Sequence, residues 1–140
     1  RYLSKDDTRR AARAYREAIT LRPNMPQAYF NLGASLSSSG HIVEAAQRFL
    51  EARERYPAGS GLWARATAQA FSMLIQEVCA KVAKPEWWND EGLKALSARV
   101  ARAAPNDVGA INMRAVVLSG QSGGAWEAGP RSAAEFKEAA

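Results

Sequence analysis

The chain has 140 residues, of which 47% are hydrophobic and 24% charged, and its formal net charge is +5. This length suits one folded core, and the sequence has no run of the 18 or so apolar residues that a membrane span requires. The single cysteine excludes an internal disulfide and there is no Asn-x-Ser/Thr sequon, so we expect an intracellular, cytoplasmic protein, with an organelle as the alternative.

A helix is predicted from about Asp6 to Leu21, and it is strongly basic. One interpretation is a patch for nucleic acid, an anionic membrane or an acidic peptide. The other, which we favour, is the solvated face of a helix rich in good helix formers, with Asp6–Arg10 and Arg13–Glu17 paired at i,i+4. The basic residues are Arg1, Lys5, Arg9, Arg10, Arg13, Arg16 and Arg22.

The next segment reads as two helices joined by a tight turn. The first carries apolar and small residues on one face, and Gly33 on that face lets the second helix approach closely. Gly40 lies where the first helix must end, and Pro57 ends the second. The face of the first helix is made by Tyr29, Leu32, Gly33 and Leu36, and that of the second by Ala45, Phe49 and Ala52.

These positions recur along the chain at a spacing of 34 residues, as in 57 − 23 = 34. Ala11, Tyr15, Ala18 and Pro23 return as Ala45, Phe49, Ala52 and Pro57, and the first-helix set returns as Trp63, Ala66, Thr67 and Ala70. The pattern resembles the tetratricopeptide repeat family. The resemblance implies an all-α fold of about seven helices, with antiparallel helix pairs stacked as a superhelix (α-solenoid). We expect one domain over 1–140, made of a partial first repeat (1–25), a complete repeat (26–59), a repeat with an insertion (60–107) and a partial, irregular repeat (108–140).

The third repeat is longer than the others. Its closing proline is Pro105, and 105 − 57 = 48, which leaves 14 residues more than one period. Because an apolar stripe continues without Gly or Pro to Val82, we expect its first helix to run beyond Ile75. Trp87 and Trp88 then turn the chain, one of them buried and the other partly exposed. Asn89 is the expected N-cap of a helix that ends near Ala103.

The fourth repeat begins near Val108 and is interrupted by a Gly/Ser-rich segment, Gly120 to Gly129, around Trp126. Pro130 suits the first turn of a last helix, in which Ser132, Phe136 and Ala139 resemble the core of another repeat. Because both ends cut through amphipathic units, we interpret the sequence as a piece of a longer array.

Residues capable of chemistry are few. His41 is expected in a turn, since no partner for metal binding or acid–base catalysis lies near it in the pattern. Cys79 falls on an apolar stripe and is expected to be buried rather than reactive. Gly123 and Gly124 do not have the context of a phosphate loop. We therefore predict no enzyme activity, no cofactor, no catalytic residue and no metal site.

The resemblance implies a protein–protein interaction scaffold whose first helices line a concave groove for a peptide or a partner helix. The partners we expect are such a protein or peptide and neighbouring repeats of the same chain, with no small-molecule substrate. Asn31 and Arg65 match part of the pattern with which some tetratricopeptide co-chaperones hold an acidic C-terminal tail, whereas Gly61 stands where those proteins have a lysine. The predicted groove residues are Gln27, Phe30, Asn31, Ala34, Ser38, Arg65, Ala68 and Phe71.

Two other functions stay open. The chain could be the regulatory or targeting arm of a larger enzyme, since tetratricopeptide arrays often have that role. It could also be a nucleic-acid-binding helical repeat that uses the basic first helix, in which case its affinity should fall steeply with salt. We do not expect nucleic acid to be the partner.

Overall fold

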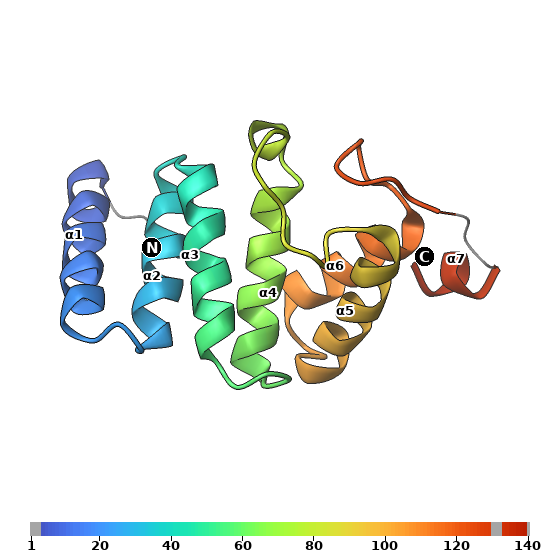
Figure 1. Cartoon of the computed structure of the whole chain (residues 1–140), viewed down its shortest axis with the longest axis horizontal. Helices are drawn as coiled ribbons and strands as arrows, with labels where there is room; N and C mark the ends of the chain where they lie inside the picture. The colour runs from blue at the N-terminus through green and yellow to red at the C-terminus, as the bar shows by residue number, and fades with distance from the viewer. Residues whose placement is uncertain (1–3, 130–132, 140) are drawn as a thin grey trace.

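The computed structural model describes residues 4–129 and 133–139, which form seven α-helices and one short 3-10 helix, with no strand in those ranges. The helices follow one another in a row, and the first four run alternately in opposite directions (Figure 1). The prediction of an all-helical chain is therefore confirmed. The helices are α1 (Lys5–Leu21), α2 (Pro26–Ser38), α3 (Ile42–Arg55), α4 (Gly61–Leu74), η1 (Glu77–Cys79), α5 (Asp90–Ala103), α6 (Val108–Ser119) and α7 (Ala133–Ala139).

Each helix packs against its neighbours in the sequence, and α4 also packs against α6. None of the helices in the described part is long and apolar enough to cross a membrane. Pro130 and Ser132, which we placed at the start of the last helix, lie outside the described residues, as does the side chain of Phe136.

The α2–α3 pair has the close approach that the sequence predicts. A Cβ atom added to Gly33 would lie 3.0 Å from the ring of Phe49, so only glycine allows the two helices to come this near. Ala45 and Ala52 on α3 are completely buried. Gly40, with a φ of 82°, has the left-handed conformation that ends α2 and turns the chain into α3.

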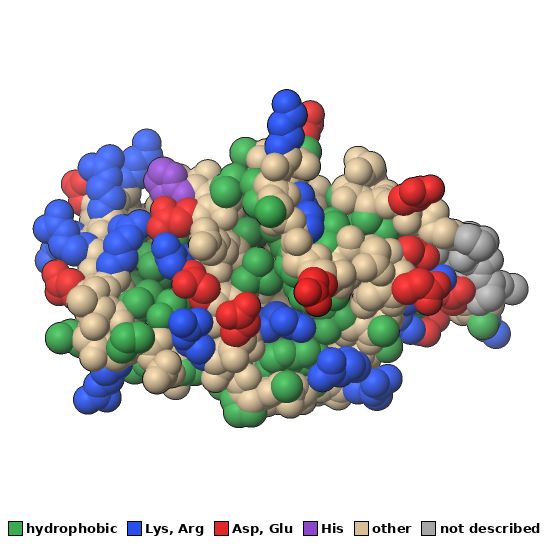
Figure 2. All heavy atoms as spheres, in the orientation of Figure 1, with side chains coloured by type: hydrophobic (Ala, Val, Ile, Leu, Met, Phe, Trp, Pro, Cys, Tyr) green, Lys and Arg blue, Asp and Glu red, His purple; other side chains and the backbone are tan. Residues whose placement is uncertain are grey.

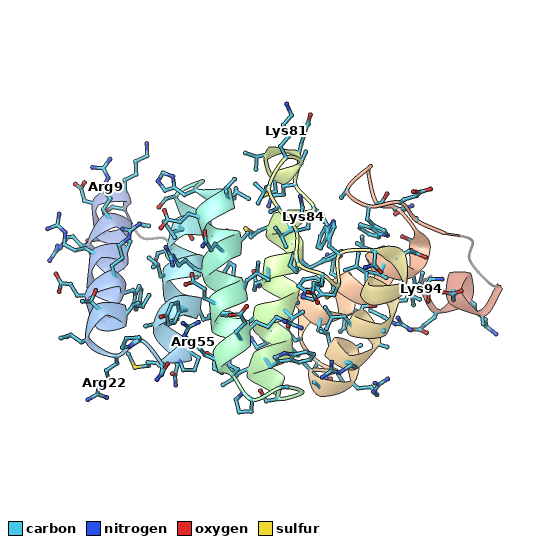
Figure 3. The ribbon with its side chains drawn as sticks, in the orientation of Figure 1. Arg9, Arg22, Arg55, Lys81, Lys84 and Lys94 are labelled. Carbon is cyan, nitrogen blue, oxygen red and sulfur yellow. The ribbon has the colours of Figure 1, made fainter. Side chains whose placement is uncertain are left out.

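The connection between α1 and α2 is fixed by a carbonyl that accepts two hydrogen bonds. The hydroxyl of Tyr29 donates to the carbonyl oxygen of Pro23 at 2.8 Å, and Nε of Arg55 donates to the same oxygen at 2.9 Å. The Arg55 guanidinium lies 4.1 Å from the centroid of the Tyr29 ring. Arg55 therefore joins α3 to both sides of this turn (Figure 3).

The third helical unit differs from our expectation. Helix α4 ends at Leu74 and is followed by η1, so the prediction that it continues beyond Ile75 was wrong. The extra residues form a connection between α4 and α5 instead. Val78, which lies within the expected apolar stripe, is 59% exposed, whereas Cys79 is completely buried. The ammonium group of Lys84 (Figure 3) donates to the carbonyl oxygens of Cys79 and Val82, which satisfies backbone groups after the helix end.

Both tryptophans of this connection are half-buried, so the expected contrast between them was also wrong. Trp87 is held by α3, because the guanidinium of Arg53 lies 5.2 Å from the Trp87 ring and 5.3 Å from that of Trp63. Nε of Arg53 also donates to Oγ1 of Thr67 at 2.9 Å. Trp88 instead contacts Phe71 on α4, with ring centroids 5.5 Å apart.

Helix α5 begins and ends as predicted. The side-chain oxygen of Asn89 accepts from the backbone N–H of Gly92 at 2.8 Å, which makes Asn89 the N-cap. A Cβ atom at Gly92 would lie 2.5 Å from the carbonyl oxygen of Trp87, so a glycine is needed where the connection meets the first turn of α5. Helix α6 starts at Val108 and ends at Ser119, and Gly120, whose φ is 71°, is its C-cap.

Candidate interaction surface

One side of α2 is accessible over its whole length. Gln27, Asn31, Ala34 and Ser38 are exposed and follow each other three or four residues apart, opposite the buried face of the helix. Within the described part of the chain, neither Gln27 nor Asn31 makes a side-chain hydrogen bond. These four predicted groove residues therefore share one surface, on which two amide groups are available to a ligand.

Phe30 borders this surface and connects it to α4. Its ring is half-buried and meets Phe49 edge to face, with centroids 5.2 Å apart and an interplanar angle of 68°. The guanidinium of Arg65 on α4 lies 5.3 Å from the Phe30 ring centroid. The structure thus brings Phe30 and Arg65 together beside the exposed side of α2.

Arg65 also contacts the beginning of α6. Its Nε lies 3.5 Å from Oδ1 of Asp107, while the arginine side chain remains 50% exposed. The other oxygen of Asp107 accepts from the N–H of Ala110 at 3.0 Å and caps α6. A carboxylate that approached Arg65 would compete with Asp107 for the guanidinium.

Two of the predicted groove residues are not accessible. Ala68 is 2% exposed and Phe71 is 1% exposed, so their assignment to an open groove has to be corrected. Ala68 faces α6, where a Cβ atom at Gly109 would lie 3.5 Å from the Cβ of Ala68. Phe71 lies beneath two tryptophans, with ring centroids 5.5 Å from Trp88 and 5.9 Å from Trp126. Helix α6, Trp88 and Trp126 therefore cover two positions that we predicted to be open.

Three large apolar side chains on α4 and α6 are exposed, which we did not predict from the sequence. Leu62 on α4 is 46% exposed, and Val108 and Ile111 on α6 are 80% and 52% exposed. The N-terminal ends of α4 and α6 lie at the same end of the molecule (Figure 1). Leu62 lies outside the core positions of the repeat pattern, which was the available signal, whereas Ile111 has one of those positions and is exposed nevertheless.

Basic side chains gather over α1 at one end of the molecule (Figure 2). In place of the predicted i,i+4 ion pairs, α1 has two i,i+3 ion pairs. Arg9 lies 4.0 Å from Asp6, and Arg10 lies 3.9 Å from Asp7. These pairs are well exposed and contribute little to stability. A cavity of about 410 Å³ opens beside them, and its lining is Thr8, Arg9, Ala12, Arg13, Arg16, Leu36, Ser39 and His41.

Two further residues capable of chemistry are His41 and Cys79. His41 occupies the N-cap position of α3 without a side-chain capping bond, as expected for a turn residue. Cys79 is buried, and that burial raises the pKa of its thiol above the ordinary value, while nearby Lys84 opposes the effect. Among the described residues, no group of His, Cys, Asp and Glu side chains is arranged to hold a metal ion.

Comparison with known proteins gives no relative for this chain: no protein-family model, no curated protein and no solved structure matches it.

Proposed function

We propose that this chain is a tetratricopeptide-type helical repeat that binds a protein or peptide segment on the surface formed by α2 and the beginning of α4. The observation that carries the proposal is the exposed side of α2 with its unused amides, next to the stacked Phe30–Arg65 pair. Small side chains at Ala34 and Ser38 leave room for a backbone to lie along the helix.

Each group has a distinct part in this binding. Asn31 offers both a donor and an acceptor, which is the combination that one residue of an extended peptide backbone requires. Arg65 supplies a half-exposed positive charge that an acidic side chain of the ligand can share with Asp107. Phe30, already fixed by Phe49 and Arg65, provides a preordered apolar contact. The ligand that fits is an extended segment with an acidic residue and an apolar neighbour.

The repeat echo in the sequence supports the same class of function. A stack of helix pairs exposes one side of successive helices, and such repeat proteins use that extended side for recognition. The 34-residue spacing of Pro23 and Pro57 and the Gly33–Phe49 approach are the features of this chain that support the tetratricopeptide assignment.

Selection from a random peptide display library tests the proposal. The whole chain is immobilised, and enriched peptides are then measured against the double variant Asn31→Ala/Arg65→Gln. We expect at least about a tenfold loss of affinity, since two polar contacts of about 0.7 kcal/mol each are removed. The matched control is Gln47→Ala/Arg102→Gln, which removes an amide and a guanidinium at exposed positions of α3 and α5.

Circular dichroism must show equal helicity in both variants. If binding survives in the Asn31/Arg65 variant and disappears when Arg9 and Arg13 are changed to glutamate, the binding surface is α1 and the proposal is wrong. Enrichment of nucleic acid rather than peptide, with a steep salt dependence, would contradict it as well.

A further inference from the structure

Two tryptophans from separate inserted segments meet at the N-terminus of α5. Trp88 comes from the connection between α4 and α5, and Trp126 from the segment between α6 and α7. Their rings are nearly perpendicular, with centroids 6.0 Å apart and an interplanar angle of 82°. Phe71 lies beneath both rings. The two segments that interrupt the repeat therefore build one aromatic corner.

The indole N–H groups of this corner are used within the protein. Nε1 of Trp88 donates to the carbonyl oxygen of Ala125 at 2.9 Å, and Nε1 of Trp126 donates to Oδ1 of Asp90 at 3.3 Å. These bonds fix the orientation of both rings. They also mean that neither indole has an N–H to offer a ligand, so the rings present carbon surface only.

A cavity of about 660 Å³ opens at this corner, within the range of about 300–1,000 Å³ that small-molecule sites have. Acidic side chains gather at this end of the molecule, opposite the basic end that α1 forms (Figure 2). The cavity is lined by Trp88, Asn89, Asp90, Glu91, Lys94, Ala125, Trp126, Glu127, Ala128 and Gly129.

The side chains of the lining are rich in acceptors and poor in donors. Three of them are carboxylates, and the exposed ones belong to Glu91 and Glu127. The ammonium group of Lys94 (Figure 3) is paired with Asp90 at 3.6 Å and with Glu135 at 3.2 Å. The amide of Asn89 is used at both ends, by the N–H of Gly92 and the carbonyl of Glu86. An anion would find few side-chain donors here, whereas a cation finds carboxylates and aromatic carbon.

We propose that this cavity binds an alkylammonium group, such as a methylated lysine side chain or a free quaternary amine. An ammonium ion is attracted to an aromatic ring within about 6 Å of its centroid, most strongly to tryptophan. The methyl or methylene groups contact the half-buried ring of Trp88 and the small accessible part of Trp126, which is 7% exposed, and the carboxylates of Glu91 and Glu127 balance the charge. Two positive groups oppose a cation here: the N-terminal end of the α5 dipole, which amounts to about half a charge, and the ammonium group of Lys94. The three carboxylates of the lining outweigh the two together.

Titration followed by NMR of the four tryptophan indole N–H groups tests the proposal on the whole chain. The probes are choline and its uncharged isostere 3,3-dimethyl-1-butanol, with sodium chloride as the ionic-strength control. We expect saturable shifts for Trp88 and Trp126 at millimolar choline, no matching shift for Trp63, and at least about fivefold weaker binding of the neutral isostere. Equal binding of choline and the isostere would overturn the proposal, because it would show an apolar pocket without cation recognition.

Two double variants distinguish the loss of negative charge at the cavity from the same loss elsewhere on the protein. Glu91→Gln/Glu127→Gln keeps the size of both side chains, and we expect it to weaken choline about fivefold to tenfold. Glu17→Gln/Glu77→Gln removes the same charge at exposed positions away from the cavity lining, and we expect unchanged affinity. If the two variants behave alike, or if neither choline nor a peptide carrying trimethyl-lysine shifts Trp88 and Trp126, the cavity is not an ammonium site.

A comparison of ligands identifies the source of the ammonium group. Tighter binding of the trimethyl-lysine peptide than of choline assigns the site to a protein partner, and the reverse order assigns it to a free amine. The test of the ammonium site does not depend on binding at the α2 surface, because Asn31→Ala/Arg65→Gln changes no residue of the cavity lining.

Discussion

Replacing Arg53 with methionine should loosen the connection between α4 and α5 and lower the stability of the chain. The guanidinium lies between the rings of Trp63 and Trp87 at 5.3 and 5.2 Å, and each such contact contributes about 0.5–1 kcal/mol at a partly exposed site. The hydrogen bond from Nε to Thr67 contributes about 1 kcal/mol. Methionine keeps the apolar contacts of the arginine stem.

Part of this loss is offset. Burial, and then repulsion from Arg99, lower the pKa of Arg53, so the charged form is disfavoured in its site and its removal relieves that cost. We therefore expect a net loss of about 1.5 kcal/mol, which lowers the urea midpoint by roughly 0.5–1.5 M for a chain of this size. Cleavage by trypsin after Lys81 should accelerate, because Trp87 no longer holds that segment against α3.

Arg99→Met is the matched control. This exposed guanidinium lies 4.7 Å from the Trp63 ring, and its removal also relieves the repulsion on Arg53, so we expect stability within about 0.5 kcal/mol of the parent chain. Urea unfolding followed by circular dichroism gives both values. Equal effects of the two substitutions, or unchanged proteolysis of Arg53→Met, would refute the account of how the connection is held.

Three further substitutions test other parts of the structure. Gly33→Val should cost about 1–3 kcal/mol, because the new side chain meets the buried Phe49 ring, whereas Gly61→Ala, with its nearest neighbour at 3.6 Å, should be neutral in the same unfolding assay. Asn89→Ala should cost about 1 kcal/mol through loss of the α5 cap, and a stability equal to that of the parent chain would contradict the capping role. The pKa of the Cys79 thiol is raised in the folded chain. The stability that the neutral, buried thiol contributes is therefore complete below the ordinary thiol pKa of about 8.5 and is lost as pH rises through the higher pKa of the folded chain. That alkaline loss should be smaller in Cys79→Ala, and native Cys79 should react with thiol reagents only as fast as the chain unfolds.

The helix pair at the centre of the chain was predictable because its determinants are local. Gly40 and Pro57 act on backbone within their own turns, Gly33 acts on the next helix along the chain, and the spacing of Ala45, Phe49 and Ala52 sets one helical face. These physical requirements can be read from residue type and position. The same holds for Asn89, whose capping bond spans three residues.

The end of α4 was not predictable in this way. No Gly or Pro follows Leu74 until Pro85, and the apolar spacing continues, yet the helix stops. The residues that hold the connection are remote in sequence: Arg53 on α3 contacts Trp87, and Ala125 accepts from Trp88. Such long-range contacts override a local helical pattern.

The exposed side chains of the candidate interaction surface were predictable from the repeat register, whereas the burial of the other predicted groove residues was not. Gln27, Asn31 and Ala34 lie opposite the core face of α2, so their exposure follows from helical geometry alone. Phe71 on α4 has the register position of Ser37 on α2, since 71 − 37 = 34, but the aromatic corner covers it. A spacing rule gives the direction of a side chain relative to its own helix and carries no information about a distant segment that folds over it.

The most direct test of the proposed function is amide hydrogen–deuterium exchange of the whole chain with and without a selected peptide. The proposal predicts slower exchange over α2 and the first two turns of α4, together with unchanged exchange over α1. Slower exchange confined to α1, or to the turn that contains His41, would place the ligand on the basic end of the molecule and contradict the proposal.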